Sequence, residues 1–335
     1  RAIVLEVVDG EETEVSEGFV SSVQYVKLKI LSGKYKGEIF EIENDLSDNV
    51  AYNIEVKEGE KIVVGIDEFD KDYLEVYISD YARQDHIFIL LAVFILLIIF
   101  IGGKQGLKAV ATLGITVFMV LKVLLPLMLK GINPIPISVT VSIAITIITI
   151  FIIGGINSKS IAAVVGTSSG VIIAGLIAYI VGSQVRLTGL NAEEATMLMY
   201  IPQGIDFDFK ALLFSGIILG ALGAIMDVGM SIASSIEEIH NANKALTRKE
   251  LFNAGMNVGK DIMGTMTNTL ILAYTGSSIP LLLLFMAYET SMIKIINLDI
   301  IATEIVRSLS GSIGLVLTIP LTALVATVLT KREKD

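Results

Sequence analysis

The first 82 residues alternate between apolar and polar positions in short runs that turn signals separate. Val26, Leu28 and Ile30 alternate with lysines, and glycines follow before the next run begins. Similar runs occupy 38–42, 61–66 and 73–78. A period of two is that of a half-buried β-strand. The pattern therefore predicts that residues 1–82 form a small all-β domain of five to six strands, a barrel or sandwich of OB-like or SH3-like size.

After residue 86 the alternation stops and long apolar runs take over. About 20 apolar residues in a helix cross the roughly 30 Å hydrocarbon core of a bilayer. The pattern predicts an α-helical polytopic membrane domain over 83–335, with seven to eight transmembrane helices. The runs lie at 87–103, 106–129, 137–154, 160–182, 210–235, 259–276, 278–293 and 308–330. Because the seventh run is short and contains Pro280, we expect it to be re-entrant, with 298–307 forming an interfacial amphipathic helix.

Composition supports this division. The 335 residues are 53% hydrophobic and 18% charged, and the mean hydropathy is +0.73, which indicates an integral membrane protein. Residues 1–82 hold 20 Asp and Glu against 8 Lys and Arg, and the remainder holds 15 against 17. The aqueous part is therefore acidic, so we expect a lipid bilayer around the rest and no nucleic acid as a partner.

The sequence lacks the residues that several kinds of site require. The chain has no Cys, and its two His, His86 and His240, are far apart, so we expect no disulfide, no thiol nucleophile and no zinc site. There is no Walker A loop and no His-Glu-x-x-His helix. We therefore expect neither an enzyme nor a cofactor, and an ion gradient or a partner must supply any energy.

The loop charges predict an orientation. Lysines at 104, 108 and 159 lie on one side of the predicted spans, whereas the loop 183–208 is acidic. Positive-inside counting places the β domain outside the cytoplasm and the loop 236–258 inside. The basic C-terminus also favours the inside, which a count of eight spans contradicts. The chain begins at Arg1, and we expect a signal or a further transmembrane helix to precede it.

Asp227 is the main candidate for chemistry in the membrane. It lies about eight residues from the cytoplasmic end of its predicted span, on the order of 12 Å, so its carboxylate cannot reach water there. Ser231 follows one turn later on the same face. An ionisable residue at this depth points to proton or cation handling, although a carboxyl group held by a neighbouring helix for packing is an alternative.

The next predicted helix offers matching polar groups. Asp261, Thr265 and Asn268 share one helical face, since they stand at i, i+4 and i+7. Asn268 lies near the middle of the membrane and needs a hydrogen-bond partner. If this face meets Asp227, the groups form a network that can exchange a proton between aqueous sides. Asp261 lies two or three residues inside its span, and a purely interfacial position is the alternative.

Glycines are expected to allow close helix contacts. Small residues let the backbones of membrane helices approach one another. The predicted packing glycines are Gly216, Gly220 and Gly223 on the Asp227 helix and Gly166 and Gly170 on an earlier span.

Three blocks of sequence resemble the YibE/F family of bacterial multi-spanning membrane proteins. They are GAIMDVGMSIASSIEEI at 223–239, DIMGTMTNTLILAYTG at 261–276 and GSIGLVLTIPLTA at 311–323, and YISDYAR at 77–83 and GGKQG at 102–106 extend the likeness. The resemblance implies a permease-like protein of the inner membrane that associates with a second copy or a related family member. A more distant similarity is to the later helices of RND-superfamily proteins, including SecD and SecF, whose embedded Asp couples transport to protons. That likeness implies an RND-like helix arrangement, with Asp227 in the coupling position.

These observations predict an inner-membrane transporter driven by a proton or Na⁺ gradient. Asp227 would bind the ion, and Asn268, Asp261, Ser231 and Thr265 would assist it. Two alternatives stay open. The β domain docks a partner and the protein is a non-transporting assembly component, or the protein is a passive channel.

Overall fold

A computed structural model describes the chain except for residues 11–12, 17–18, 48–52, 71–72, 202–203 and 333–335. The chain divides into two compact units, Arg1–Leu97 and Ile98–Asp335.

The first unit is an antiparallel sheet. Its strands are β1 (Ala2–Asp9), β2 (Thr13–Ser16), β3 (Phe19–Ile30), β4 (Ile39–Leu46), β5 (Lys61–Asp70) and β6 (Tyr73–Tyr81). The strand order is β2-β3-β1-β5-β6, and β4 pairs with the other edge of β3. Alternate residues of β1 and β3, including Val4, Val26 and Leu28, pack on Ile62 of β5 in a fully buried core. The predicted two-residue period thus follows the inner face of the sheet.

The sheet is open and does not close into a barrel, which was one of the two predicted forms. β1 pairs with β5 only at Ala2–Ile62 and Ile3–Lys61, after which the two strands separate. Among the described residues no hydrogen-bonded ladder joins β4 to β6. Closure depends on pairing between strands far apart in sequence, which alternation within each strand does not specify.

The second unit is helical, and its first helix begins in the first unit, because the boundary at Leu97 lies inside that helix. Its main helices are α1 (Gln84–Phe118), α3 (Pro134–Gly154), α4 (Ser158–Gln184), α6 (Phe209–Ala242), α7 (Arg248–Ser277) and α10 (Asp299–Arg332). Shorter elements are the π-helix η1 (Met119–Leu124), α2 (Leu125–Met128), α5 (Glu193–Met197), the 3₁₀ turn η2 (Leu198–Tyr200), α8 (Ile279–Ala287) and α9 (Met292–Ile296).

Capping side chains explain where four of the long helices begin. Asn133, Asn157 and Asp208 accept hydrogen bonds from the first-turn backbone of α3, α4 and α6. Thr247 and Glu250 form a reciprocal capping box at the start of α7. Each cap satisfies backbone donors that the first turn of a helix leaves free.

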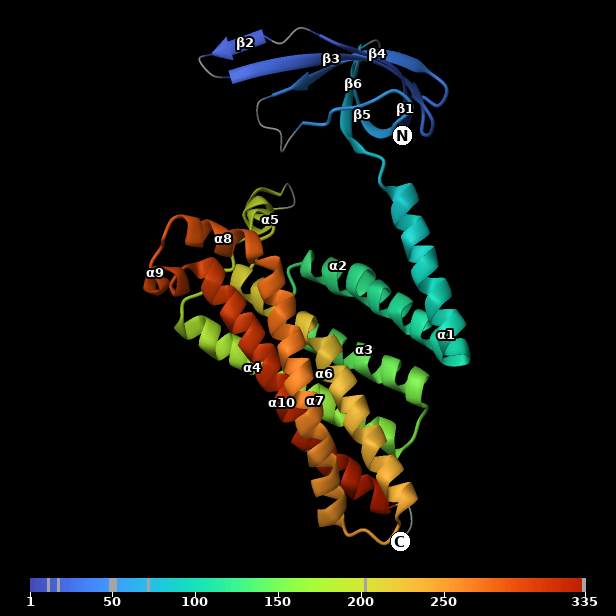
Figure 1. Cartoon of the computed structure of the whole chain (residues 1–335), viewed down its shortest axis with the longest axis vertical. Coiled ribbons are helices and arrows are strands. Elements are labelled where there is room, and N and C mark those ends of the chain that lie inside the picture. Colours follow the sequence, from blue (N-terminus) through green and yellow to red (C-terminus); the bar gives the residue numbers. More distant parts are fainter. Residues whose placement is uncertain (11–12, 17–18, 48–52, 71–72, 202–203, 333–335) are drawn as a thin grey trace. The chain divides into compact units, whose positions relative to one another are not determined.

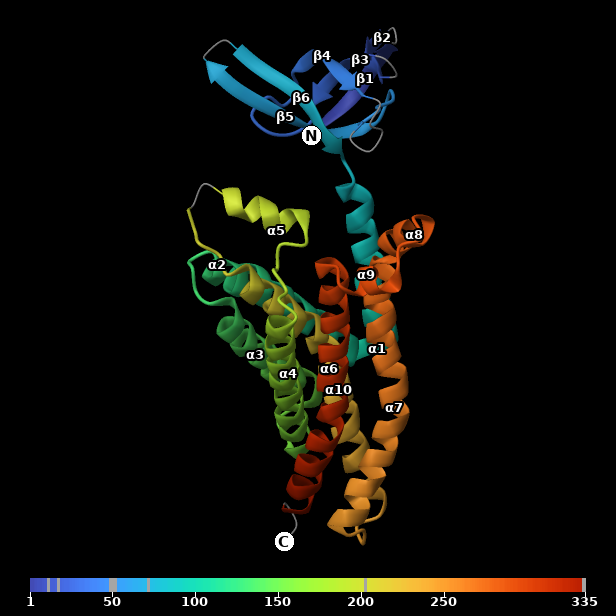
Figure 2. The same ribbon diagram turned by 90° about the vertical axis from the view of Figure 1, so that its left-hand side faces the viewer.

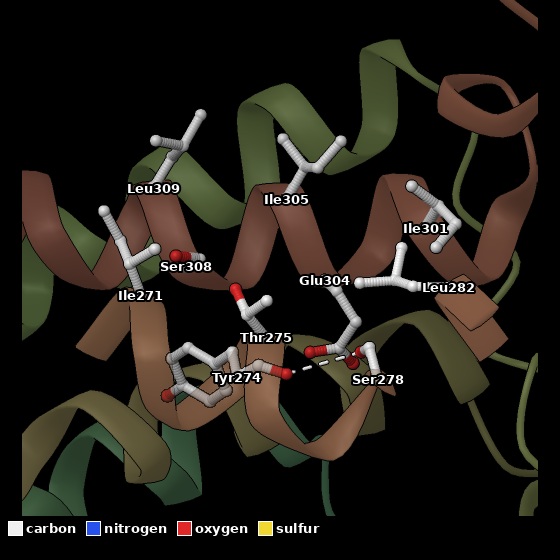
Figure 3. A pocket seen from close by; sticks show the side chains of 10 residues that line it. All are labelled: Ile271, Tyr274, Thr275, Ser278, Leu282, Ile301, Glu304, Ile305, Ser308 and Leu309. Atoms are coloured by element: carbon white, nitrogen blue, oxygen red, sulfur yellow. Dashed lines mark hydrogen bonds between the residues drawn. The ribbon is translucent and has the colours of Figure 1, made fainter. Parts of the chain in front are cut away.

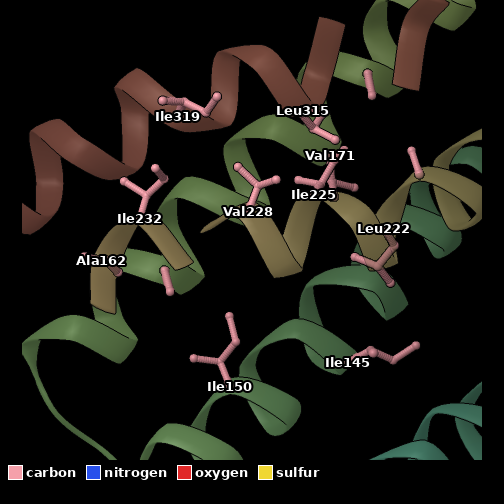
Figure 4. Close-up of a cluster of buried hydrophobic side chains, with 14 of the residues drawn as sticks. Ile145, Ile150, Ala162, Val171, Leu222, Ile225, Val228, Ile232, Leu315 and Ile319 are labelled. Carbon is pink, nitrogen blue, oxygen red and sulfur yellow. The ribbon is translucent and has the colours of Figure 1, made fainter. Parts of the chain in front are cut away.

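α4, α6 and α10 form the centre of this unit, and α3 and α7 pack around them. Their shared core consists of aliphatic side chains such as Val171, Ile225, Val228 and Leu315, all almost fully buried (Figure 4). The short helices α5, α8 and α9 lie at one end of the unit, whereas the α6–α7 turn and the end of α10 lie at the other (Figures 1 and 2).

Within the part of the chain that the structure describes, five helical stretches are long and apolar enough to cross a membrane, or six if the bent pair α7–α8 is one span. The number of separate stretches is lower than the seven to eight transmembrane helices predicted, for two reasons. The first two predicted runs share one stretch, Gln84–Met128, which Gly103 interrupts with a φ of 53° and a ψ of −126°. Gly106 then lies against the backbone of Ile98, so the chain turns back sharply there.

The second reason is the seventh run, which does not form a span of its own. α8 has only 9 residues and is bent by 62° from α7. A helix of this length covers roughly 14 Å, less than half of a hydrocarbon core. The predicted interfacial helix 298–307 is also absent as a separate element, because α10 is continuous from Asp299. Ile301, Thr303 and Val306 are buried, which holds this first part of α10 in the helical unit.

Candidate functional site

The predicted coupling residue Asp227 lies on α6, on the face opposite the core. The buried face of α6 includes Ile225, Val228 and Ile232, which are fully buried. Asp227 follows three glycines at spacings of four, three and four residues, so these positions share one side of the helix. The exposed stripe of α6 consists of Gly216, Gly220, Gly223 and Asp227.

α7 has a similar exposed polar face. Its buried positions include Gly255, Gly259 and Leu270. The remaining predicted residues, Asp261, Thr265 and Asn268, are exposed, and so is Gly264 between them. We call the exposed stripe of α6 together with this face of α7 the polar seam.

The packing of α6 against α7 fixes their relative level. A Cβ on Gly255 would lie 2.6 Å from Cδ1 of Ile236, and one on Gly259 would lie 3.3 Å from Cδ1 of Ile232. Because the helices are antiparallel, this register places Gly264 at the level of Asp227. Asn268 is then about 6 Å further along the axis. The structure thus brings Asp227, Thr265 and Asn268 to neighbouring levels of one helix pair, but on its outer surface and not between the helices.

The polar groups of the seam have few partners in the described part of the chain. Asp227, Asp261 and Asn268 form neither a hydrogen bond nor an ion pair there. The hydroxyl of Thr265 donates to the carbonyl of Ile262 in its own helix, at 3.0 Å. Ser231 is half-buried beside the seam. The carboxylate of Asp227 is therefore available to an ion, to water or to another chain.

The two earlier glycines are in a different place. Gly166 and Gly170 are buried where α10 crosses α4, against the hydroxyl groups of Thr322 and Thr318. A Cβ on Gly314 of α10 would lie 2.7 Å from the carbonyl oxygen of Gly170. These glycines contribute to helix packing and are remote from the polar seam in sequence and in contacts.

The sequence interpretation missed a charged pair on α10. Arg307 donates to a carboxylate oxygen of Glu304 at 2.6 Å, and both side chains are about three-quarters buried. The guanidinium also lies 5.9 Å from the ring centroid of Tyr274 on α7, within the range of a cation–π contact. The spacing of three residues between an acid and a base was a visible signal.

Tyr274 connects this pair with the polar seam. A Cβ on Gly220 would lie 2.8 Å from the hydroxyl oxygen of Tyr274. The missing side chain at Gly220 thus leaves room for the tyrosine. The ring contacts the exposed stripe of α6 through its hydroxyl and the charged pair of α10 through its π-system.

A second missed pair joins Lys159 at the start of α4 to Glu237 near the end of α6, at 2.6 Å. No three His, Asp or Glu side chains within the described ranges converge where they could hold a metal ion.

Comparisons with protein families cover both units. A model described as the YibE/F family N-terminal domain matches residues 1–81, and a model described as YibE/F-like protein matches residues 90–332. Neither the curated proteins nor the solved structures give a match, and the more distant similarity to RND-superfamily helices is not shown. With its apolar membrane-capable helices and matches over nearly its whole length, this chain belongs to the YibE/F family of membrane proteins.

Proposed function

We propose that this protein is an ion-gradient-coupled transporter of the bacterial inner membrane, in which Asp227 binds a proton or Na⁺. The observation that supports this most is that the carboxylate of Asp227, on a membrane-capable helix, has no partner among the described residues. Asp227 is 17 residues after Lys210 and 10 before Glu237, the charged residues that flank it on α6, about 26 Å and 15 Å along the axis. An Asp side chain is too short to reach water at either end.

Exposure of this carboxylate to lipid is unfavourable by about 2.5–3.5 kcal/mol on insertion scales. The glycines around it offer another arrangement. A Cβ on Gly216, Gly223 or Gly264 would meet no atom within 4 Å. Space beside Asp227 is therefore free for water or an ion along the polar seam, provided that another surface shields the seam from lipid.

The helix arrangement supports an orientation with the β domain outside. We propose seven crossings: the single apolar stretch Gln84–Met128 crosses twice because Gly103 turns it back, the bent pair α7–α8 crosses once, and the other four stretches cross once each. An odd number puts the two termini on opposite sides, so the basic C-terminus lies inside if the β domain lies outside. The conflict created by eight spans then disappears.

The charges of the loops agree with this orientation. The turns after α3 and α6 belong to the same side as the C-terminus, and the long connection from α4 to α6 belongs to the other. Basic residues favour the cytoplasmic side. The cytoplasmic group comprises Lys104, Lys159, Lys244, Arg248 and Lys249, and the external connection carries Glu193, Glu194, Asp206 and Asp208.

Coupling would follow from the two charge states of Asp227. Binding of a proton or Na⁺ neutralises the carboxylate, so the loaded residue can enter an apolar environment that the charged form avoids. Asn268 and Thr265 supply polar atoms at nearby levels, and Asp261 lies closer to the cytoplasmic end of α7. Movement of the α6–α7 pair could then expose Asp227 to one side and the other in turn.

Cysteine accessibility tests this proposal, because the chain has no Cys of its own. Gly223→Cys places a thiol one turn from Asp227. A membrane-impermeant methanethiosulfonate reagent should modify it from either side of sealed vesicles. The control is Leu176→Cys on α4, which is 54% exposed but lies outside the seam. Protection of position 223 from both sides, to the level of the control, would contradict a transport path there.

A non-transporting assembly component is the second candidate. Small and polar residues on an exposed membrane helix are also typical of helix–helix interfaces. The β domain adds an exposed surface with Tyr25 and Val8, half exposed, beside Glu6 and Glu41 in a depression of about 330 Å³. This candidate predicts stoichiometric co-purification of a second copy or a related family member, and no ion flux. A passive channel instead predicts flux without coupling.

A further inference from the structure

A cavity between α7, α8 and α10 is separate from Asp227. Its volume is about 260 Å³, slightly below the 300–1,000 Å³ of most drug-sized ligand sites. The 62° bend between α7 and α8 brings Leu282 of α8 to the cavity wall, which Ile271 of α7 and Ile305 and Leu309 of α10 continue. Ile271, Ile305 and Leu309 are exposed, so the cavity opens on the surface of the helical unit and has largely apolar walls.

The polar groups that line the space between α7 and α10 include the hydroxyls of Thr275 and Ser308 and the carboxylate of Glu304 (Figure 3). Neither hydroxyl forms a hydrogen bond within the described part of the protein. One carboxylate oxygen of Glu304 accepts from Arg307, whereas Oε2 is buried without a partner among the described residues. A buried polar atom without a partner is unfavourable, and a donor brought by a ligand would satisfy it after a small shift of the side chain.

The charges of the cavity limit the kind of ligand that it can bind. Arg307 compensates the charge of Glu304 at 2.6 Å and also stacks near Tyr274. The cavity therefore carries no net charge, and a ligand with a full charge would lose hydration without gaining an opposite charge. A hydroxyl can both donate and accept, as Glu304, Thr275 and Ser308 require.

We propose that this cavity binds an uncharged amphiphile, a hydroxyl head group on a hydrocarbon chain. The head group donates to Glu304 and exchanges hydrogen bonds with Thr275 and Ser308, and the chain lies along Ile305 and Leu309. The volume fits the head group and the first part of one chain. The site does not depend on the role of Asp227.

Photo-crosslinking of the full chain in nanodiscs tests this site. The probe is a hexadecanol that carries a diazirine near its head group, and mass spectrometry locates the crosslink. We expect labelling of the α7–α8–α10 cavity, and competition by hexadecanol at least tenfold stronger than by hexadecanoate or hexadecyltrimethylammonium. Labelling elsewhere, or equal competition by the charged amphiphiles, would overturn the proposal.

Variants sharpen the test. Thr275→Val should weaken labelling roughly fivefold, the effect of one neutral hydrogen bond, whereas Thr269→Val should not. Thr269 is an exposed threonine of the same helix outside the cavity, which makes it a matched control. Glu304→Gln leaves Arg307 uncompensated, so hexadecanoate should become the better competitor. An unchanged head-group preference in Glu304→Gln would count against the proposal, and if that variant does not fold, the wild-type competition and the Thr275→Val comparison decide.

Discussion

The crossing of α4 and α10 allows a quantitative test of packing with one substitution at two places. Gly170→Ala would put a methyl group against the hydroxyl of Thr318, 2.9 Å from the carbonyl oxygen of Gly314 and 3.0 Å from Cγ2 of Ile225. Two of these three neighbours belong to α10, and one is backbone, so the strain cannot be relieved by rotation of a side chain alone. Gly216→Ala is the control, because a Cβ there meets nothing within 4 Å.

The magnitude follows from two opposing terms. Replacement of a helical Gly by Ala stabilises a helix by roughly 0.5–1 kcal/mol at either position. Overpacking of a close contact opposes this by about 1–3 kcal/mol, and only at Gly170. The two variants should therefore differ by about 1–3 kcal/mol, with Gly216→Ala equal to or more stable than the wild type.

Thermal unfolding in detergent, followed by circular dichroism at a helix band, measures this difference. For a unit of this size 1 kcal/mol corresponds to a shift in Tm of about 2–4 °C. Thr318→Ala in the Gly170→Ala background should recover part of the loss, since it removes the nearest atom. If Gly170→Ala is as stable as Gly216→Ala, α4 and α10 are not packed as closely as described, and the reasoning fails.

Two further predictions concern the turn at Gly103 and an ion pair of the β domain. Gly103→Ala should lower the Tm by an amount equivalent to about 1–3 kcal/mol, because the positive φ at this position is strained for any residue other than glycine. Gly102→Ala is the control and should leave the Tm unchanged. Equal Tm values for the two variants would rule out the sharp turn. In the β domain, hydrogen bonds from Lys34 and Tyr35, each 2.7 Å, hold the pKa of Glu68 below its usual range. Because the pKa of Glu68 is lowered in the folded state, the ion pair contributes fully to stability above the usual Glu pKa of about 4.3, and this contribution is lost as the pH falls through the lower pKa of the folded state. Glu68→Gln should therefore flatten the loss of Tm on acidification below about pH 4. An unchanged acid profile would show that the pair contributes nothing to stability.

The sequence pattern predicted individual strands and helices better than the way in which they pair or connect. Alternation between Val23 and Ile30 marks β3 correctly, because each strand buries its own alternate residues. Pairing of the sheet edges is not local, so the open sheet could not be read from any one strand. Similarly, the first apolar run ends at Gly103, where the chain turns back. The short length of the run 278–293 and its Pro280 predicted a re-entrant segment, and the structure has a short helix there: α8 ends at Ala287, and Glu289 has a positive φ of 46°.

The candidate site shows a comparable limit. Periodicity placed Asp261, Thr265 and Asn268 on one face of α7 and Asp227 on one face of α6, and the structure has them there. Periodicity does not say which way a face points, and we expected these faces to meet each other. The core of the helix pair is instead made by Gly259, Ile232 and their neighbours. The sequence did not show that the pair Glu304–Arg307 lies beside Tyr274, because Tyr274 is thirty residues before Glu304 and comes close to the pair only in the folded structure.

The role of Asp227 is best tested by proton flux in proteoliposomes under an imposed pH gradient, with a pH-sensitive dye inside. The wild type should acidify the lumen, Asp227→Asn should not, and Asp261→Asn should lose less, because Asp261 directly follows the charged Lys260, whereas Asp227 is 10 residues from the nearest charged residue of α6. Circular dichroism and size-exclusion profiles confirm that each variant is folded. A parallel Na⁺ gradient distinguishes the two ions. Equal flux of both ions through the wild type and Asp227→Asn would contradict the assignment of Asp227 as the coupling residue.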